Sequence, residues 1–208
     1  SIQLSIVYCS DELEVTQPGG LVTHLGYCNQ EKQYGLQMTR LNTRIGTFNC
    51  RTLRAEAKLK ELVYQFGYHG LGIITLQEHR IVHAETVRQT QAGPGETLIT
   101  STAWRNSAGA SVGGVGVLMR TEYSKLICEI RAVSHRILAI TLAGNPKLTV
   151  ISVYSPTECA NVEEVEKFHH DLRDYITTVP AHNLLVVAGD FNARIGWADS
   201  GFGWYFHQ

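Results

Sequence analysis

The sequence of 208 residues lacks several features that would assign it to a special class of protein. No apolar run approaches the ~18 residues that a membrane-spanning helix needs. No basic segment followed by an apolar segment stands at the start, so a signal peptide is not indicated. The five cysteines are scattered and form no C-x-x-C pair, which argues against a zinc knuckle and a dense disulfide framework. We therefore expect an intracellular protein, nuclear or cytoplasmic, with neither a membrane partner nor zinc.

The chain also lacks an excess of charge of either sign. It has 18 basic and 19 acidic residues, for a formal net charge of −1. Electrostatics therefore give no general attraction to nucleic acid, and binding of a polyanion would need a local basic patch or a metal. The glycine run at 113–116 lacks the full G-x-G-x-x-G spacing and leads into a strand-like run, so a dinucleotide site is not expected.

What the chain does contain is enough apolar sequence for a folded domain. Hydrophobic residues make up 44%, which excludes global disorder. Residues 1–43 show little periodicity beyond a possible short strand at 2–8, and we treat them as a leader of uncertain structure. We expect residues 44–208 to form a domain, or part of one. The chain starts with Ser1 rather than Met, so we expect a fragment or a processed product.

Helical and strand-like segments alternate in residues 44–208. Residues 55–66 and 161–179 carry apolar stripes of helical period, and Asn161 is a suitable N-cap for the second. Residues 83–97 are polar and predict a loop. Short apolar runs predict strands at 44–49, 71–76, 97–104, 113–120, 126–130, 137–142, 148–154 and 184–188. This pattern predicts an α/β fold of mixed sheets covered by helices.

Polar side chains follow four of these strands at the point where each strand ends. They are Asn49, Glu78, Tyr154, and Asp190 with Asn192. The side chains of Asp190 and Asn192 share a face if the backbone stays extended there. Because ligand sites gather at the carboxyl ends of strands in open α/β sheets, these oxygen-bearing groups could form one pocket. Oxygen ligands suit Mg²⁺, or Mn²⁺, and such a site suits a phosphate ester. Taken alone, residues 189–192 are equally compatible with an ordinary turn.

Other polar residues have weaker interpretations. His79 and His83 lie four residues apart beside Glu78, but the spacing differs from H-E-x-x-H, and a surface role is favoured over zinc. Four arginines could contact phosphates near the site, although each taken singly is more often solvated or ion-paired: Arg51, Arg54, Arg80 and Arg194. Cys50 fits a small core residue.

Five motifs in order carry a resemblance to a known family. They are RIGTFNCRTL, LQEHR, GGVGVLM, VISVYSPTE and VVAGDFNARIG, which span about residues 44–196. The sequence resembles the endonuclease/exonuclease/phosphatase superfamily, and within it the endonuclease domains of non-LTR retrotransposons and the related craniofacial development protein 2 group. The resemblance implies a DNase I-like four-layer sandwich, with two mixed sheets face to face and helices outside.

The resemblance also implies a function and roles for residues. The function would be Mg²⁺-dependent phosphodiester hydrolysis, with endonucleolytic nicking of DNA and expulsion of a 3′-oxygen. Glu78 would be the main metal ligand with Asn49 beside it, and Arg51 and Arg194 could bind substrate. Three further residues would act on the nucleophile and phosphate: Asp190 on the attacking water, Asn192 on the nucleophile or a phosphate oxygen, and Tyr154 on the scissile phosphate.

The sequence departs from the family at its end. The family closes its site with a late Ser-Asp-His motif, and no such motif occurs among residues 191–208. We therefore expect a domain truncated at its C-terminus. The alternative function is a catalytically incomplete fragment or pseudoenzyme that acts at most as a nucleic-acid or protein binding module. A nucleotide or inositol-phosphate phosphatase is a lesser alternative.

Overall fold

The structure is a computed structural model that describes residues 5–6, 43–157 and 160–192. Arg194 and most of the leader fall outside these ranges. The described elements, in chain order, are β1 Ser5–Ile6, β2 Ile45–Asn49, α1 Glu56–Tyr68, β3 Ile73–Gln77, β4 Val87–Gly93, β5 Glu96–Ser101, β6 Trp104–Arg105, β7 Ser111–Val112, β8 Val115–Arg120, α2 Thr121–Ser124, β9 Ile127–Ser134, β10 Ile137–Leu142, β11 Leu148–Tyr154, α3 Val162–Thr178 and β12 Leu184–Asp190.

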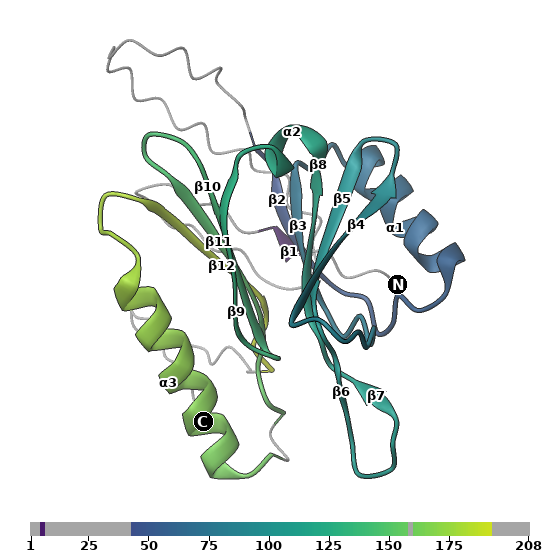
Figure 1. Cartoon of the computed structure of the whole chain (residues 1–208), viewed down its shortest axis with the longest axis vertical. Coiled ribbons are helices and arrows are strands. Elements are labelled where there is room, and N and C mark those ends of the chain that lie inside the picture. The colour runs from purple at the N-terminus through teal and green to yellow at the C-terminus, as the bar shows by residue number, and fades with distance from the viewer. Residues whose placement is uncertain (1–4, 7–42, 158–159, 193–208) are drawn as a thin grey trace, which may run out of the picture.

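Two sheets lie face to face, with one long helix outside each (Figure 1). The larger sheet has six strands in the order β1-β2-β3-β8-β5-β4, and the smaller has four in the order β12-β11-β10-β9. The pairs β2–β3 and β11–β12 are parallel, whereas the other pairs are antiparallel. This arrangement is the predicted four-layer sandwich of two mixed sheets. The short β6–β7 hairpin extends beyond one end of it.

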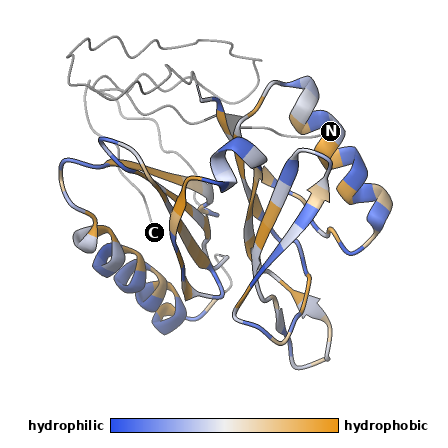
Figure 2. Ribbon diagram, turned by 45° about the horizontal axis from the view of Figure 1, so that its top comes forward, coloured by the Kyte–Doolittle hydropathy of each residue, from blue (hydrophilic) through white to orange (hydrophobic). Residues whose placement is uncertain are grey.

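Three hydrophobic clusters separate the four layers. The first lies between the sheets and includes Ile73, Val117, Leu138 and Val150. The second packs α1 on the larger sheet, and the third packs α3 on the smaller sheet. Because neighbouring side chains of a strand point to opposite faces, a central strand needs apolar residues at every position to meet two clusters. Figure 2 shows the central strands as largely hydrophobic, which agrees with their continuous apolar runs.

Both long helices form where the apolar periodicity predicts them. Leu62 and Phe66 are buried on α1, and Phe168, Leu172 and Tyr175 are buried on α3. Helix α3 begins after Asn161, whose side chain accepts a hydrogen bond of 2.7 Å from the backbone N–H of Glu164, so the predicted N-cap is confirmed. None of the helices in the described ranges is long and apolar enough to cross a membrane.

The prediction of a loop over residues 83–97 is wrong, because residues 87–93 form strand β4. This strand lies at the edge of the larger sheet and pairs with β5. Its central residues are exposed, so the strand carries none of the alternation that marks a half-buried strand. Polar residues on an exposed edge strand also protect a sheet from pairing with another chain. The pairing partner, rather than the segment's own hydrophobicity, makes this segment a strand.

Residues Ser5–Ile6 of the leader form β1, which pairs with β2 in antiparallel orientation. The short strand predicted near the start therefore exists over two residues. This part of the leader therefore adds a strand at the edge of the larger sheet.

Gly189 lets β12 approach β11 closely just before the strand ends. A Cβ atom at this position would lie 1.9 Å from the carbonyl oxygen of Val153. Strand β12 continues through Gly189 to Asp190, which is paired with Tyr154 of β11. The absence of a side chain at Gly189 therefore allows the ends of β11 and β12, at Tyr154 and Asp190, to lie close together.

We predict that Gly189→Ala destabilises the protein by roughly 1–3 kcal/mol, because backbone must move to admit the methyl group. Gly67→Ala is the matched control. Gly67 lies within α1, and a Cβ atom added there would meet no atom within 4 Å, so alanine should be neutral or stabilise the helix by up to about 1 kcal/mol. Urea unfolding measures both changes, and equal midpoints for the two variants would contradict the close approach.

Candidate active site

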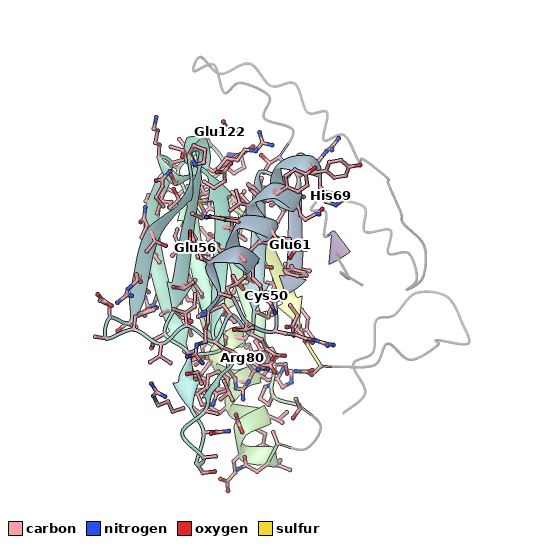
Figure 3. The ribbon with its side chains drawn as sticks, turned by 90° about the vertical axis from the view of Figure 1, so that its right-hand side faces the viewer. Cys50, Glu56, Glu61, His69, Arg80 and Glu122 are labelled. Atoms are coloured by element: carbon pink, nitrogen blue, oxygen red, sulfur yellow. The ribbon has the colours of Figure 1, made fainter. Side chains whose placement is uncertain are left out.

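Four strand ends from the two sheets converge at one end of the sandwich. Asn49 ends β2, Glu78 directly follows β3, Tyr154 ends β11 and Asp190 ends β12. Parallel pairing brings β2 and β3 to the same edge of one sheet, and β11 and β12 to the same edge of the other. In Figure 3, Arg80 marks this end of the molecule, and Glu122 marks the opposite end.

The Asn49 side chain joins the two sheets. Its Nδ2 donates hydrogen bonds of 2.9 Å to Oε1 of Glu78 and of 2.9 Å to Oδ2 of Asp190. Its Oδ1 accepts a bond of 3.1 Å from the backbone N–H of Arg51. One amide group thus holds two carboxylates that are 112 residues apart in the chain (190 − 78). The amide oxygen, which the sequence predicted as a metal ligand, is directed at Arg51 in this arrangement.

Glu78 is held in its ionised form by its neighbours. Burial alone would raise its pKa, but hydrogen bonds from Asn49 and Arg80, the charge of Arg80, and a hydrogen bond from Tyr154 outweigh burial and lower the pKa. The Arg80 guanidinium lies 2.6 Å from the Glu78 carboxylate, and the Glu78 side chain is 18% exposed. Glu78 is therefore a carboxylate at neutral pH, accessible from one side.

Tyr154 is held in the opposite state, as a neutral phenol. Burial, the charge of Glu78 with a hydrogen bond to it, and the charge of Asp190 raise the Tyr154 pKa to about 12. A phenol that keeps its proton over the whole physiological range can donate a hydrogen bond to an anionic ligand. The strand ends thus combine negative oxygen ligands with a neutral donor.

Asn192 lies beside Asp190 but does not share its face. Its φ of 47° is left-handed, so the backbone leaves the extended conformation that would place the two side chains in parallel. The Asn192 side chain instead donates a 2.7 Å hydrogen bond to the carbonyl oxygen of Ser155. Its backbone N–H donates to Oδ1 of Asp190 at 3.0 Å. As placed here, Asn192 orients the Asp190 carboxylate, and the predicted shared face is wrong.

The loops around these strand ends contain unusual backbone conformations. Glu78, Arg80 and Arg51 have φ values of 54°, 57° and 50°. Non-glycine residues in the left-handed region carry a cost of about 1–2 kcal/mol, and such residues concentrate where the surrounding structure holds functional groups in place. The surrounding structure therefore holds Glu78 and Arg80, in the segment that follows β3, in conformations that they would not adopt on their own.

His79 anchors this segment from within the protein. The sequence favoured a surface role for His79 and His83, but both are buried, with 0% and 8% exposure. Nδ1 of His79 accepts a 3.0 Å hydrogen bond from the Ile81 N–H, and Nε2 lies 3.3 Å from the carbonyl oxygen of Val115. A neutral ring with its proton on Nε2 satisfies both contacts. The surface prediction was wrong because the residues after β3 turn back over the β8 end of the sheet.

His79 predicts a specific loss of stability at acidic pH. Burial lowers its pKa to about 4 in the folded protein, while the unfolded chain binds the proton near pH 6.5. The neutral His79 ring therefore contributes to the free energy of unfolding above pH 6.5. This contribution is lost as the pH falls toward 4, by roughly 2 kcal/mol at pH 5. His79→Gln keeps an acceptor and a donor without titrating. Urea unfolding in EDTA should show that the free energy of unfolding falls more steeply with decreasing pH for the wild type than for this variant. Parallel pH profiles would contradict a buried neutral His79.

A pocket of about 330 Å³ opens beside Glu78 and Tyr154. Arg136 lines it and connects several elements: its Nη2 lies 2.6 Å from Oε1 of Glu164 on α3, and its Nη1 donates to the carbonyl oxygen of Tyr154 at 3.3 Å. Its guanidinium also lies over the ring of Trp104, 4.6 Å from the centroid. The sequence offered no signal for Arg136 or Trp104, because they lie in a β-turn and a two-residue strand without a motif.

The donor set fits a hard divalent cation. Glu78 and Asp190 both supply carboxylate oxygens near one point, and the lowered pKa of Glu78 keeps it ionised. In the described part of the chain, no group of three or more His, Cys, Asp or Glu side chains forms a metal cluster. Mg²⁺ does not need such a cluster, because it is usually held by one or two carboxylates with water and substrate oxygens.

Comparison with known proteins defines the class of this chain. Residues 46–208 match the Endonuclease/Exonuclease/phosphatase family. The chain belongs to this family. It is 32% identical over 84 residues to craniofacial development protein 2 of Bos taurus and 31% identical over 84 residues to that of Tragulus javanicus. These matches cover 40% of this chain and 14–15% of those proteins.

Solved structures share the fold. The AP endonuclease LMAP from Leishmania major superposes with a TM-score of 0.57 at 16% identity, covering 75% of this chain and 58% of that one. An AP endonuclease from Archaeoglobus fulgidus gives 0.53 at 18% identity, with 73% and 58% coverage. The 3′ phosphatase NExo from Neisseria, bound to a product DNA hairpin, gives 0.51 at 20% identity, with 72% and 57% coverage. The chain thus spans a little over half the length of these enzymes.

Proposed function

We propose that this protein is a metal-dependent phosphodiesterase that cleaves a nucleic acid strand, with endonucleolytic nicking of DNA as its reaction. The observation that carries the proposal is the junction at Asn49, where one amide holds Glu78 of one sheet and Asp190 of the other. Two carboxylates at converging strand ends, with a neutral phenol beside them, suit hydrolysis of a phosphate diester. The match to the Endonuclease/Exonuclease/phosphatase family supports the same class of reaction.

We assign a role to each residue of the site. Glu78 would be the principal residue to hold Mg²⁺ or Mn²⁺, and the chemistry such a cation would supply is neutralisation of the charge that develops on the phosphate oxygens. Asn49 would add a ligand oxygen only after its amide turned over, since Nδ2 now faces both carboxylates. Arg51 and Arg194 are proposed to contact the substrate backbone. Arg51 adjoins the site, and Arg194 lies outside the described residues.

Asp190 receives a proton from the attacking water in this proposal. Its Oδ2 is bound by Asn49 and its Oδ1 by the backbone N–H of Asn192, so the carboxylate is fixed in orientation. The water oxygen attacks phosphorus while the bond from phosphorus to the 3′-oxygen breaks. The 3′-oxygen leaves as an alkoxide that takes a proton from solvent water, and Asp190 returns the proton it received to solvent. Tyr154 donates a hydrogen bond to a phosphate oxygen as negative charge builds up there. Its raised pKa keeps that proton available.

We predict that Glu78→Gln and Asp190→Asn each lower the rate of plasmid nicking in Mg²⁺ by roughly 100-fold or more, and that Tyr154→Phe lowers it by roughly 10- to 100-fold. Conversion of supercoiled to open-circular plasmid measures the rate. EDTA should abolish nicking, and added Mg²⁺ should restore it.

Two exposed glutamates provide matched controls. Glu122→Gln on α2, at the opposite end of the molecule, and Glu61→Gln on α1, the helix outside the larger sheet, remove the same charge from exposed positions and should leave nicking unchanged (Figure 3). Wild-type nicking by the Glu78 and Asp190 variants would refute the assignment. The alternative of a binding module without turnover predicts that the wild type retains an oligonucleotide but never cleaves it. Turnover of a mononucleotide in preference to plasmid would instead favour a phosphatase.

A further inference from the structure

A second pocket adjoins the strand-end site on the far side of Arg80. Its volume is about 330 Å³. Its lining combines three arginines with a hydroxyl and three apolar side chains, and no carboxylate of the described residues lines it. The lining residues are Leu53, Arg54, Arg80, Ile81, Val82, Arg105 and Ser111. Such a concentration of positive charge is unexpected in a chain whose net charge is −1.

The arginines of this pocket come from three separate elements. Arg54 precedes α1, Arg80 follows β3, and Arg105 belongs to β6 of the protruding hairpin. The pocket therefore exists only because the ends of these elements meet at the same end of the sandwich (Figure 1). Arg80 lines this pocket and also the first one, so the two pockets are neighbours that share this side chain.

These arginines have donors to offer to a ligand. Within the described residues, Arg54 and Arg105 form no ion pair, and Nη1 of Arg105 donates only to the carbonyl oxygen of Gly109 at 2.9 Å. Arg80 pairs with Glu78 through Nη2, but its Nε is buried without a hydrogen-bond partner in the described part of the chain. A buried donor left unsatisfied is costly, so a ligand oxygen that reached it would be bound favourably.

The chemistry of the pocket matches a backbone phosphate of a nucleic acid strand. Guanidinium groups bind phosphate oxygens through two parallel hydrogen bonds, and they are less strongly hydrated than ammonium groups. Leu53, Ile81 and Val82 offer apolar contact for sugar faces beside the phosphate. Because Arg80 borders both pockets, a nucleic acid strand with one phosphate beside Glu78 can place a neighbouring phosphate in this pocket.

We propose that the pocket of Arg54, Arg80 and Arg105 binds a phosphate that flanks the scissile one, so that the protein takes polynucleotides rather than single nucleotides as substrates. This proposal rests on the proposed function for the strand-end site. It supplies the local basic patch that a chain without net positive charge needs in order to hold a polyanion.

The test uses Arg54→Gln, Arg105→Gln and the double variant of the full chain, with Arg173→Gln as control. Arg173 is an exposed residue of α3 that lines neither pocket, so its substitution removes the same charge elsewhere. Fluorescence anisotropy with a labelled oligonucleotide in EDTA measures affinity as a function of salt. Each pocket substitution should weaken binding roughly tenfold and reduce the slope of log affinity against log salt by about one.

Hydrolysis gives a second, independent readout in Mg²⁺. The pocket variants should raise KM for plasmid nicking, and they should leave hydrolysis of the small diester bis(4-nitrophenyl) phosphate unchanged because it has no flanking phosphate. Thermal unfolding confirms that each variant is folded. Failure of the wild type to hydrolyse either substrate would refute the proposed function, while the anisotropy would still test the pocket. Unchanged affinity and salt slope in the double variant, or an equal loss in Arg173→Gln, would overturn the phosphate pocket.

Discussion

The amide of Asn49 is the contact on which the strand-end site depends. It donates to Glu78 from the larger sheet and to Asp190 from the smaller one, so it fixes the spacing of two negative groups across the sandwich. Without a donor between them, two carboxylates at such close quarters would repel each other, and one would tend to take up a proton. The packed core of the sandwich brings the strand ends together, and the hydrogen bonds from the Asn49 amide reduce the repulsion between the two carboxylates.

Charge in this protein is separated in space although it is balanced in number. Arg80 stands at the boundary, paired with Glu78 on one side and grouped with Arg54 and Arg105 on the other. A cation bound at the carboxylates and a phosphate bound at the arginines would each complete the local balance. An overall charge near zero therefore excludes a general attraction to nucleic acid, but it does not exclude a local binding surface of positive charge.

The elements that the sequence predicted well are those buried on two faces or on one clear stripe. The strand at 148–154 and the start of α3 after Asn161 match because hydrophobic burial and capping leave direct marks in the sequence. Strand β4 was missed because an exposed edge strand needs no apolar pattern. The surface role expected for His79 was wrong because a polar residue is buried when its ring nitrogens find backbone partners, which depends on residues far away in sequence.

The sequence by itself determined which chemical groups stand at the strand ends: Asn49, Glu78, Tyr154 and Asp190 each follow an apolar run that must be a buried strand. Only the tertiary structure decided how they interact, that Asn49 turns its nitrogen to both carboxylates and that Asn192 turns aside toward Ser155. It also decided that Arg136 and Trp104 border the same pocket. Local periodicity records burial, whereas hydrogen-bond direction and long-range neighbours arise only when separate strands are packed together.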